Sequence, residues 1–126
     1  MAHFVLEYSA NLGLQQDHVQ KLMEQLHTSA QQTGLFPLKG IRSRAYVCDQ
    51  YRMADGNTHH GFAHLEVKVG AGRSLADRQA VAEQFFSVFT QFFDVHFEQR
   101  GMALSFELRE LEPVLKFNKN NIQDYL

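Results

Sequence analysis

The chain has 126 residues, a length that suits one ordinary domain with one core. Hydrophobic residues make up 44% and charged residues 21% of the sequence, which excludes a disordered or fibrous chain. Twelve Lys and Arg are scattered among fourteen Asp and Glu, and this balance excludes the basic footprint of a nucleic-acid binder.

The amino terminus has neither a positively charged segment nor an apolar run of signal-peptide length. Nowhere does the sequence hold the roughly 18 consecutive apolar residues of a membrane-spanning helix. Cys48 is the only cysteine, so an internal disulfide has no second partner. These features predict a cytoplasmic protein that does not enter a membrane.

The first half of the chain predicts a strand, a helix and a second strand. Residues 4–8 combine β-branched and aromatic residues before a turn-prone Ser-Ala-Asn, which indicates a strand. Residues 14–33 carry apolar side chains at helical spacing, and Gly34 stands where a left-handed cap would end the helix. Residues 41–47 alternate as a half-buried strand does. The apolar stripe of the helix comprises Val19, Leu22, Met23, Leu26 and Ala30.

The second half repeats this order after a polar turn at residues 53–57. Residues 62–69 again indicate a strand. A second helix is expected from Ser74, where Ser-Leu-Ala-Asp resembles a capping box, to Arg100-Gly101. Residues 104–108 alternate as a fourth strand. The second stripe keeps a constant sequence offset from the first and comprises Ala82, Phe85, Phe86, Phe89 and Phe93.

The doubled strand-helix-strand pattern predicts one α+β domain over residues 1–126, with pseudo-repeats at about 2–57 and 58–126. Right-handed crossovers would give a four-stranded mixed sheet with two helices on one face. The other face then lacks cover, and Val88, Phe92 and Phe97 lie outside the second stripe. We therefore expect a homo-oligomer; a crowded core is the alternative explanation for those three side chains.

Two groups of residues could bind a carboxylate. In residues 69–74, backbone N–H groups, the start of a helix and the Arg73 guanidinium would face one spot. Arg42 and Arg44 alternate on one strand and would point to the same face. The alternatives are a turn shaped by its glycines beside a solvated Arg73, and surface ion pairs for Arg42 and Arg44.

Other reactive residue types lack a supporting pattern. No carboxylate or cysteine completes a zinc set around His59, His60 and His64, so we expect no metal site there. Cys48 has no flanking motif of a catalytic nucleophile, and we expect a buried or edge thiol.

Six short blocks spread over nearly the whole chain carry a more specific signal. They are residues 2–4, 34–38, 40–44, 53–56, 70–75 and 103–107. Together these blocks resemble the 5-carboxymethyl-2-hydroxymuconate isomerase family of the tautomerase superfamily. The Gly-Arg-Ser at 72–74 alone would indicate only the superfamily.

This resemblance implies a fold like that of macrophage migration inhibitory factor and a homotrimer with sites near subunit boundaries. It also implies a cofactor-free enzyme that ketonises a dienol tricarboxylate in the bacterial breakdown of homoprotocatechuate, an aromatic compound. In the family, an amino-terminal proline moves the proton and arginines hold the carboxylates. By position those arginines correspond to Arg42 and Arg73, with Arg44 as a neighbouring substrate-binding residue.

The chain departs from the family at the residue after Met1, where Ala2 replaces proline. If Met1 is removed, Ala2 presents an α-amine with a reference pKa of about 7.7 to 8.0, which nearby arginines and burial would lower. A retained Met1 would leave an amide that accepts no proton. We expect a slow isomerase of an enolic di- or tricarboxylate, with Ala2, Arg42 and Arg73 as catalytic residues. The alternative is a non-catalytic carboxylate-binding or oligomeric scaffold protein.

Overall fold

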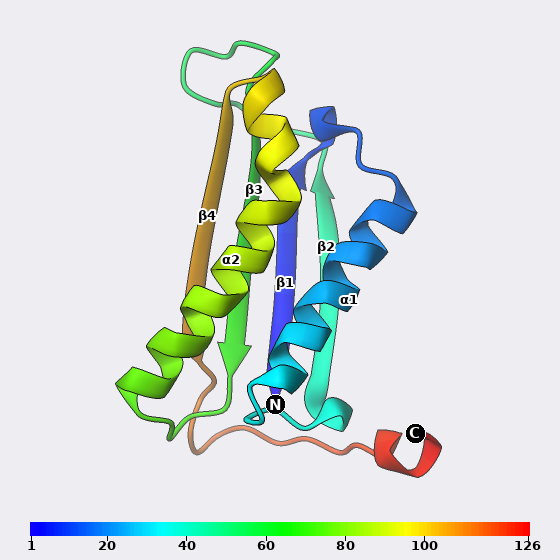
Figure 1. Cartoon of the computed structure of the whole chain (residues 1–126), viewed down its shortest axis with the longest axis vertical. Coiled ribbons are helices and arrows are strands. Elements are labelled where there is room, and N and C mark those ends of the chain that lie inside the picture. Colours follow the sequence, from blue (N-terminus) through cyan, green and yellow to red (C-terminus); the bar gives the residue numbers. More distant parts are fainter.

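The computed structural model describes all residues from 1 to 126, as an open sheet with two helices across one face (Figure 1). The strands are β1 (Ala2–Ser9), β2 (Ile41–Cys48), β3 (Gly61–Val69) and β4 (Met102–Glu110). The helices are α1 (Gln16–Gln32) and α2 (Leu75–Gln99). Three short 3-10 turns complete the chain: η1 (Ala10–Leu12), η2 (Leu38–Gly40) and η3 (Ile122–Tyr125).

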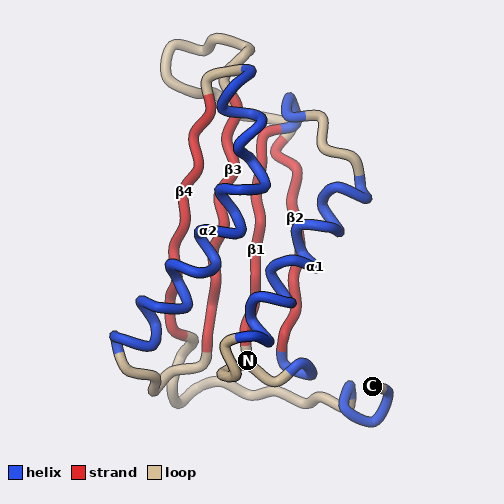
Figure 2. Tube along the Cα trace, in the orientation of Figure 1, coloured by secondary structure: helices blue, strands red, loops and turns tan.

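The strand order in the sheet is β2-β1-β3-β4. β1 runs parallel to β2 and antiparallel to β3, while β3 runs parallel to β4. Both helices lie on the same side of the sheet, and the opposite side carries none (Figure 2). The expected mixed four-stranded α+β fold is therefore confirmed.

Alternating side chains of the two central strands build the core. In β3, Ala63, Leu65, Val67 and Val69 are buried beneath the helices, and the residues between them are only partly buried. Phe4 of β1 continues the core, with its ring edge-on to Phe85 at 5.0 Å between centroids. This period of two explains why the strands were recognisable from sequence.

The apolar stripe of α2 differs from the one expected. Its buried residues are Val81, Phe85, Phe89 and Phe93, whereas Phe86 is 41% exposed and Ala82 is half-buried. The Phe86 ring lies toward the outer strand, 5.9 Å from the ring of Phe106 in β4. The stripe expected from the constant offset between the two helices is therefore wrong at Ala82 and Phe86. The side chains of α2 that face the sheet form a single row, with one buried residue at every fourth position.

Both helices begin and end within two residues of the expected positions, but α2 does not end in a left-handed glycine. Gly34 follows α1 with φ +72°, the left-handed conformation that favours glycine. Ser74 caps α2, since its Oγ accepts a hydrogen bond from the Asp77 N–H at 3.1 Å. α2 ends at Arg100 in an extended conformation. Gly101 serves a close approach there, because a Cβ atom would lie 2.4 Å from Nδ1 of His60.

Four segments meet at the end of the sheet where β1 begins. Ala2 lies between Ile41, the first residue of β2, and Val69, the last residue of β3. The turn η2 precedes Ile41, and the loop to α2 follows Val69. The carboxyl-terminal tail leaves β4 and crosses the same end of the sheet (Figure 1). Neither α-helix combines the length and apolar composition needed to cross a membrane.

Candidate active site at the start of strand β1

Ala2 is fully buried in the middle of the sheet end. Met1 precedes it and is held by two neighbouring segments. The Met1 carbonyl accepts a hydrogen bond from the Gly70 N–H at 3.2 Å. On the other side, a Cβ atom added to Gly40 would lie 3.3 Å from the Met1 Cα. The amino-terminal residue is thus packed between η2 and the loop that follows β3.

Arg73 lies in that loop with its guanidinium held by neutral groups. Its Nη1 donates to the Gly70 carbonyl at 3.0 Å, and its Nη2 donates to the Leu35 carbonyl at 2.8 Å. The guanidinium carbon lies 4.6 Å from the centroid of the Phe36 ring. No carboxylate forms an ion pair with Arg73. The side chain is therefore oriented while its charge stays free for an external anion.

The backbone N–H groups of this loop do not form the open anion cradle expected from the sequence. Gly70 donates to Met1, and the Gly72 N–H donates to Oε2 of Glu110 at 2.9 Å. The other Glu110 oxygen lies 3.6 Å from Nη1 of Arg78. β4 extends beyond the expected residues 104–108 to Glu110, which brings this carboxylate to the loop. Two of the backbone donors of this loop are therefore occupied while Met1 is present, and the Arg73 guanidinium keeps its charge for a ligand.

Arg42 and Arg44 lie on alternate positions of β2 and share the face of the sheet without helices. Arg42 is paired in register with His3, one residue from the Ala2–Ile41 pair, and is exposed. Arg44 lies farther from the sheet end, with its Nη1 3.5 Å from Nδ1 of His3. Neither arginine forms an ion pair with a carboxylate. The structure therefore places Arg42 and Arg73 near the amino terminus, whereas Arg44 lies farther along β2.

The electrostatics of this end favour a neutral amine. Burial, followed by the positive charges of Arg73, Lys116 and Arg42, lowers the pKa of the Met1 α-amine below its ordinary 8.0. Burial, together with Arg42 and then Arg44, also lowers the pKa of His3. A group of cations without acidic partners surrounds the start of β1, which is an arrangement that attracts carboxylates.

Lys116 was missed by the sequence reasoning. It lies in the tail after β4, where no periodic pattern or motif draws attention to a residue, and its charge is the only signal. Phe117 and Asn118 next to it are exposed, Phe117 by 90%. A groove of about 430 Å³ opens beside η2, lined by Arg42 together with Lys119 and Asn120 of the tail. The tail therefore forms one wall of this groove, which shares Arg42 with the candidate site.

The three histidines considered for a metal do not converge. The His60 Nε2 lies 2.9 Å from Oδ1 of Asp55, and the His64 Nδ1 lies 2.7 Å from Oγ of Ser105. The backbone N–H of His59 donates to the side chain of Asn57. No group of three or more His, Cys, Asp or Glu side chains is placed to hold a metal ion. Cys48 is a half-buried free thiol at the end of the edge strand β2.

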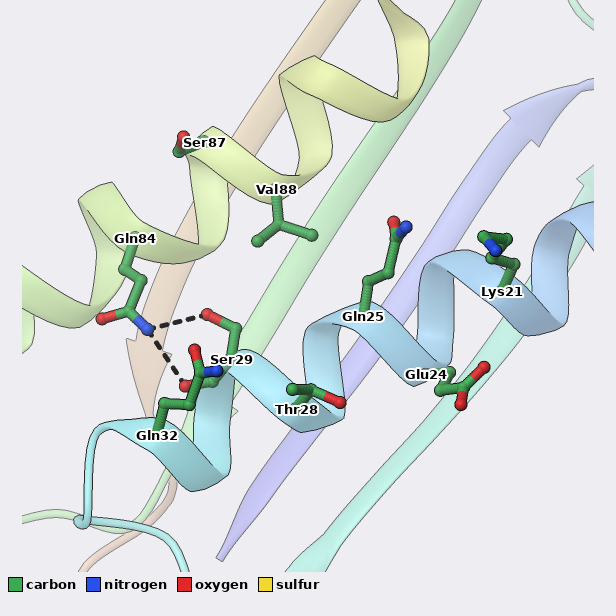
Figure 3. Close-up of a pocket in the computed structure, with 9 residues that line it drawn as sticks. All are labelled: Lys21, Glu24, Gln25, Thr28, Ser29, Gln32, Gln84, Ser87 and Val88. Carbon is green, nitrogen blue, oxygen red and sulfur yellow. Dashed lines mark hydrogen bonds between the residues drawn. The ribbon is translucent and has the colours of Figure 1, made fainter.

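A second groove, of about 560 Å³, lies between α1 and α2 (Figure 3). Gln84 of α2 donates from its Nε2 to the carbonyl and the hydroxyl of Ser29 in α1, at 3.0 and 2.9 Å. Amide, hydroxyl and charged side chains line this groove, with Val88 as its one apolar residue. None of the candidate residues lies there, so this groove is a polar seam between the helices.

Comparison with known proteins gives a consistent result. A model of the family described as 5-carboxymethyl-2-hydroxymuconate isomerase matches residues 2–126. The chain is 41% identical over 122 residues to a 5-carboxymethyl-2-hydroxymuconate Delta-isomerase of Escherichia coli, a match that covers 97% of this chain and 96% of the relative.

Solved structures show the same fold. The crystal structure of a 5-carboxymethyl-2-hydroxymuconate isomerase from Deinococcus radiodurans R1 matches with a TM-score of 0.89 and 34% identity, covering 98% of this chain and 92% of that one. The Q0 fused 4-OT wild type symmetric trimer matches with a TM-score of 0.66 and 15% identity, covering 93% of this chain and 90% of that one. The second likeness concerns the fold alone.

Proposed function

Because the chain belongs to the 5-carboxymethyl-2-hydroxymuconate isomerase family, we propose that it is a cofactor-free tautomerase that ketonises an enolic di- or tricarboxylate. The compound in the name of the family, 5-carboxymethyl-2-hydroxymuconate, is the proposed substrate, and the breakdown of aromatic compounds is the proposed setting. One observation carries the proposal: the α-amine at the start of β1 is partly buried among cations that have no acidic partner.

Ketonisation moves one proton. The enol O–H bond breaks as a C=O bond forms, the double bonds shift, and a new C–H bond forms at a carbon farther along the molecule. One amine can accept the hydroxyl proton and return it to that carbon, provided that the amine is neutral at the working pH. Burial and the neighbouring cations lower the pKa of the Met1 amine, and the same surroundings would favour the neutral form of an amine at Ala2.

The proposed base is the α-amine of Ala2 after removal of Met1. With Met1 in place, the Ala2 nitrogen belongs to a peptide bond and the amine lies one residue away. Removal of Met1 also frees the Gly70 N–H, whose acceptor is the Met1 carbonyl. A backbone donor and an amine would then face the space that Met1 occupies, where a substrate oxygen could accept the hydrogen bond.

Arg42 and Arg73 are the proposed carboxylate clamps. A guanidinium donates charge-assisted hydrogen bonds to a carboxylate, and neither arginine is engaged by an acid of the chain. The Arg73 guanidinium also donates to two backbone carbonyls, which hold it in place and leave its charge unpaired. Arg44 is a weaker candidate because its guanidinium faces His3. Binding the carboxylates on both sides of the amine would hold the enol within reach of the base.

We further propose that the protein acts as a homotrimer. Several apolar side chains of the tail are exposed in the single chain, among them Val114 at 75%, Leu115 at 75% and Phe117 at 90%. Apolar surface of this kind is typical of subunit contacts. Sedimentation velocity tests this proposal, since a monomer at micromolar concentration would contradict it.

Turnover tests the proposed function. Protein whose intact mass shows the loss of Met1 should convert 5-carboxymethyl-2-hydroxymuconate faster than buffer does. A Met1-free protein that binds the carboxylate without converting it would instead support the alternative, a non-catalytic carboxylate-binding or scaffold protein. The packing of Met1 over Ala2 is the observation that favours this alternative for chains that retain Met1.

A further inference from the structure

We propose that Lys116 is a third cation of the site and binds the substrate carboxylate that Arg42 and Arg73 leave free. This inference rests on the proposed function, because it concerns the same site. It adds a substrate-binding residue that selects tricarboxylates over dicarboxylates.

The course of the tail places Lys116 at the end of β1. The Leu111 N–H donates to the Val69 carbonyl at 2.8 Å, and the Asn120 side chain donates to the Lys39 carbonyl at 2.8 Å. Val69 is one strand partner of Ala2, and Lys39 lies in the turn that leads to the other. The segment between these two anchors must therefore cross the start of β1, as Figure 1 shows.

Within this segment Lys116 faces inward. Lys116 is half-buried, whereas the other residues from 112 to 120 are exposed. Lysine side chains are normally exposed, and a half-buried lysine packs its aliphatic stem against the molecule while its ammonium stays able to bind an anion. Lys116 forms no ion pair in the chain. An external anion is the partner that this position lacks.

The acids nearest to Lys116 in sequence are engaged elsewhere. Glu112 accepts hydrogen bonds from the backbone N–H groups of Val114 and Leu115, so its carboxylate closes a turn of the tail. Glu110 accepts from Gly72 and lies near Arg78. Neither carboxylate neutralises Lys116, which therefore keeps its charge for a ligand.

The charge of Lys116 acts at the amino terminus. Among the cations that lower the pKa of the Met1 amine, Lys116 ranks after Arg73 and before Arg42. It therefore belongs to the same electrostatic site as the two arginines. 5-Carboxymethyl-2-hydroxymuconate has three carboxylates, two from the muconate and one from the carboxymethyl group. Two guanidinium forks and one compact ammonium would match that number.

A matched pair of ligands tests the proposal. Propane-1,2,3-tricarboxylate differs from glutarate only by its central carboxylate, and calorimetry measures the binding of both to the Met1-free full chain. Lys116→Gln should weaken binding of the tricarboxylate about five- to tenfold and that of glutarate less than twofold. Lys116→Arg should restore most of the lost affinity. Lys21→Gln, which removes one positive charge from the surface of α1, should change neither affinity appreciably.

The proposal is overturned if Lys116→Gln weakens both ligands equally, if it weakens neither, or if the wild-type chain does not prefer the tricarboxylate. Binding is measured without turnover, so the two proposals can fail separately. If the protein is inactive but Lys116→Gln loses affinity for the tricarboxylate alone, the proposed function is wrong and the role of Lys116 stands. If the protein is active but this selective loss is missing, the proposed function stands and the role of Lys116 is wrong.

Discussion

Met1 and Gly70 are joined by a backbone hydrogen bond of 3.2 Å from the Gly70 N–H to the Met1 carbonyl. The Met1 carbonyl therefore occupies the Gly70 N–H. The carbonyl of the same Gly70 accepts a hydrogen bond from the Arg73 guanidinium, so this guanidinium lies beside the occupied donor. If this space is the substrate site, the state of the amino terminus decides whether the site is filled or open.

Substitution of Ala2 by proline should raise the rate severalfold in Met1-free protein. Proline supplies a secondary amine whose ring limits its orientation, and the family resemblance places proline at this position. The measurement is kcat/KM for 5-carboxymethyl-2-hydroxymuconate, with circular dichroism as the check that the fold is kept. An unchanged rate would mean that the amine is not the base.

The rate should depend on pH through the terminal amine. The amine is cationic when protonated, so a lowered pKa means that the neutral base persists to lower pH. The cations that lower the pKa of the Met1 amine also surround Ala2, so we expect kcat/KM of the Met1-free protein to rise with pH and level off, with a midpoint below 8.0. High salt should move this midpoint upward, because it screens Arg73, Lys116 and Arg42. A flat profile, or a midpoint above 8.0, would contradict the assignment.

Arg73→Ala should weaken carboxylate binding by roughly 10- to 100-fold, since a charge-assisted hydrogen bond contributes about 1.5–3 kcal/mol. Arg73→Lys should restore little, because an ammonium cannot reproduce the contacts of the fork to Gly70 and Leu35. Arg109→Ala is the control, since Arg109 pairs with Glu66 and Glu107 on β3 and β4. If Arg73→Ala and the wild type bind glutarate with equal affinity, Arg73 does not bind the carboxylate.

Substitutions in α2 test which residues form its buried row. Phe85→Ala should lower the free energy of unfolding by about 3–5 kcal/mol, because the ring is fully buried against Phe4 and Phe36. Phe86→Ala should cost roughly 1 kcal/mol, because that ring is 41% exposed. Urea unfolding measures both. Similar losses for the two variants would contradict the packing of α2.

The sequence predicted the strands and helices because burial on this sheet follows a simple period. Alternation in residues 62–69 and the helical spacing from Val19 to Ala30 are local patterns, and the caps at Gly34 and Ser74 are local too. The error at Phe86 arose because the offset between the repeats does not determine which side chains of α2 face the sheet.

The site was less accessible from sequence, because long-range contacts define it. Glu110 reaches the Gly72 N–H across the fold, and this contact occupies one donor of the expected amide cradle. Lys116 reaches the amino terminus only because the tail is anchored at Val69 and Lys39. Local pattern made Arg42 and Arg73 candidates, but their spacing alone favoured surface roles, and only the family resemblance made them the preferred carboxylate-binding residues.

The central claim is that the free amine of Ala2 carries the proton. The most direct measurement compares kcat/KM of the same chain with and without Met1, after intact mass has established each form. We predict at least about a 100-fold higher value without Met1, the size of effect that general base catalysis contributes. Equal values for the two forms would contradict the account.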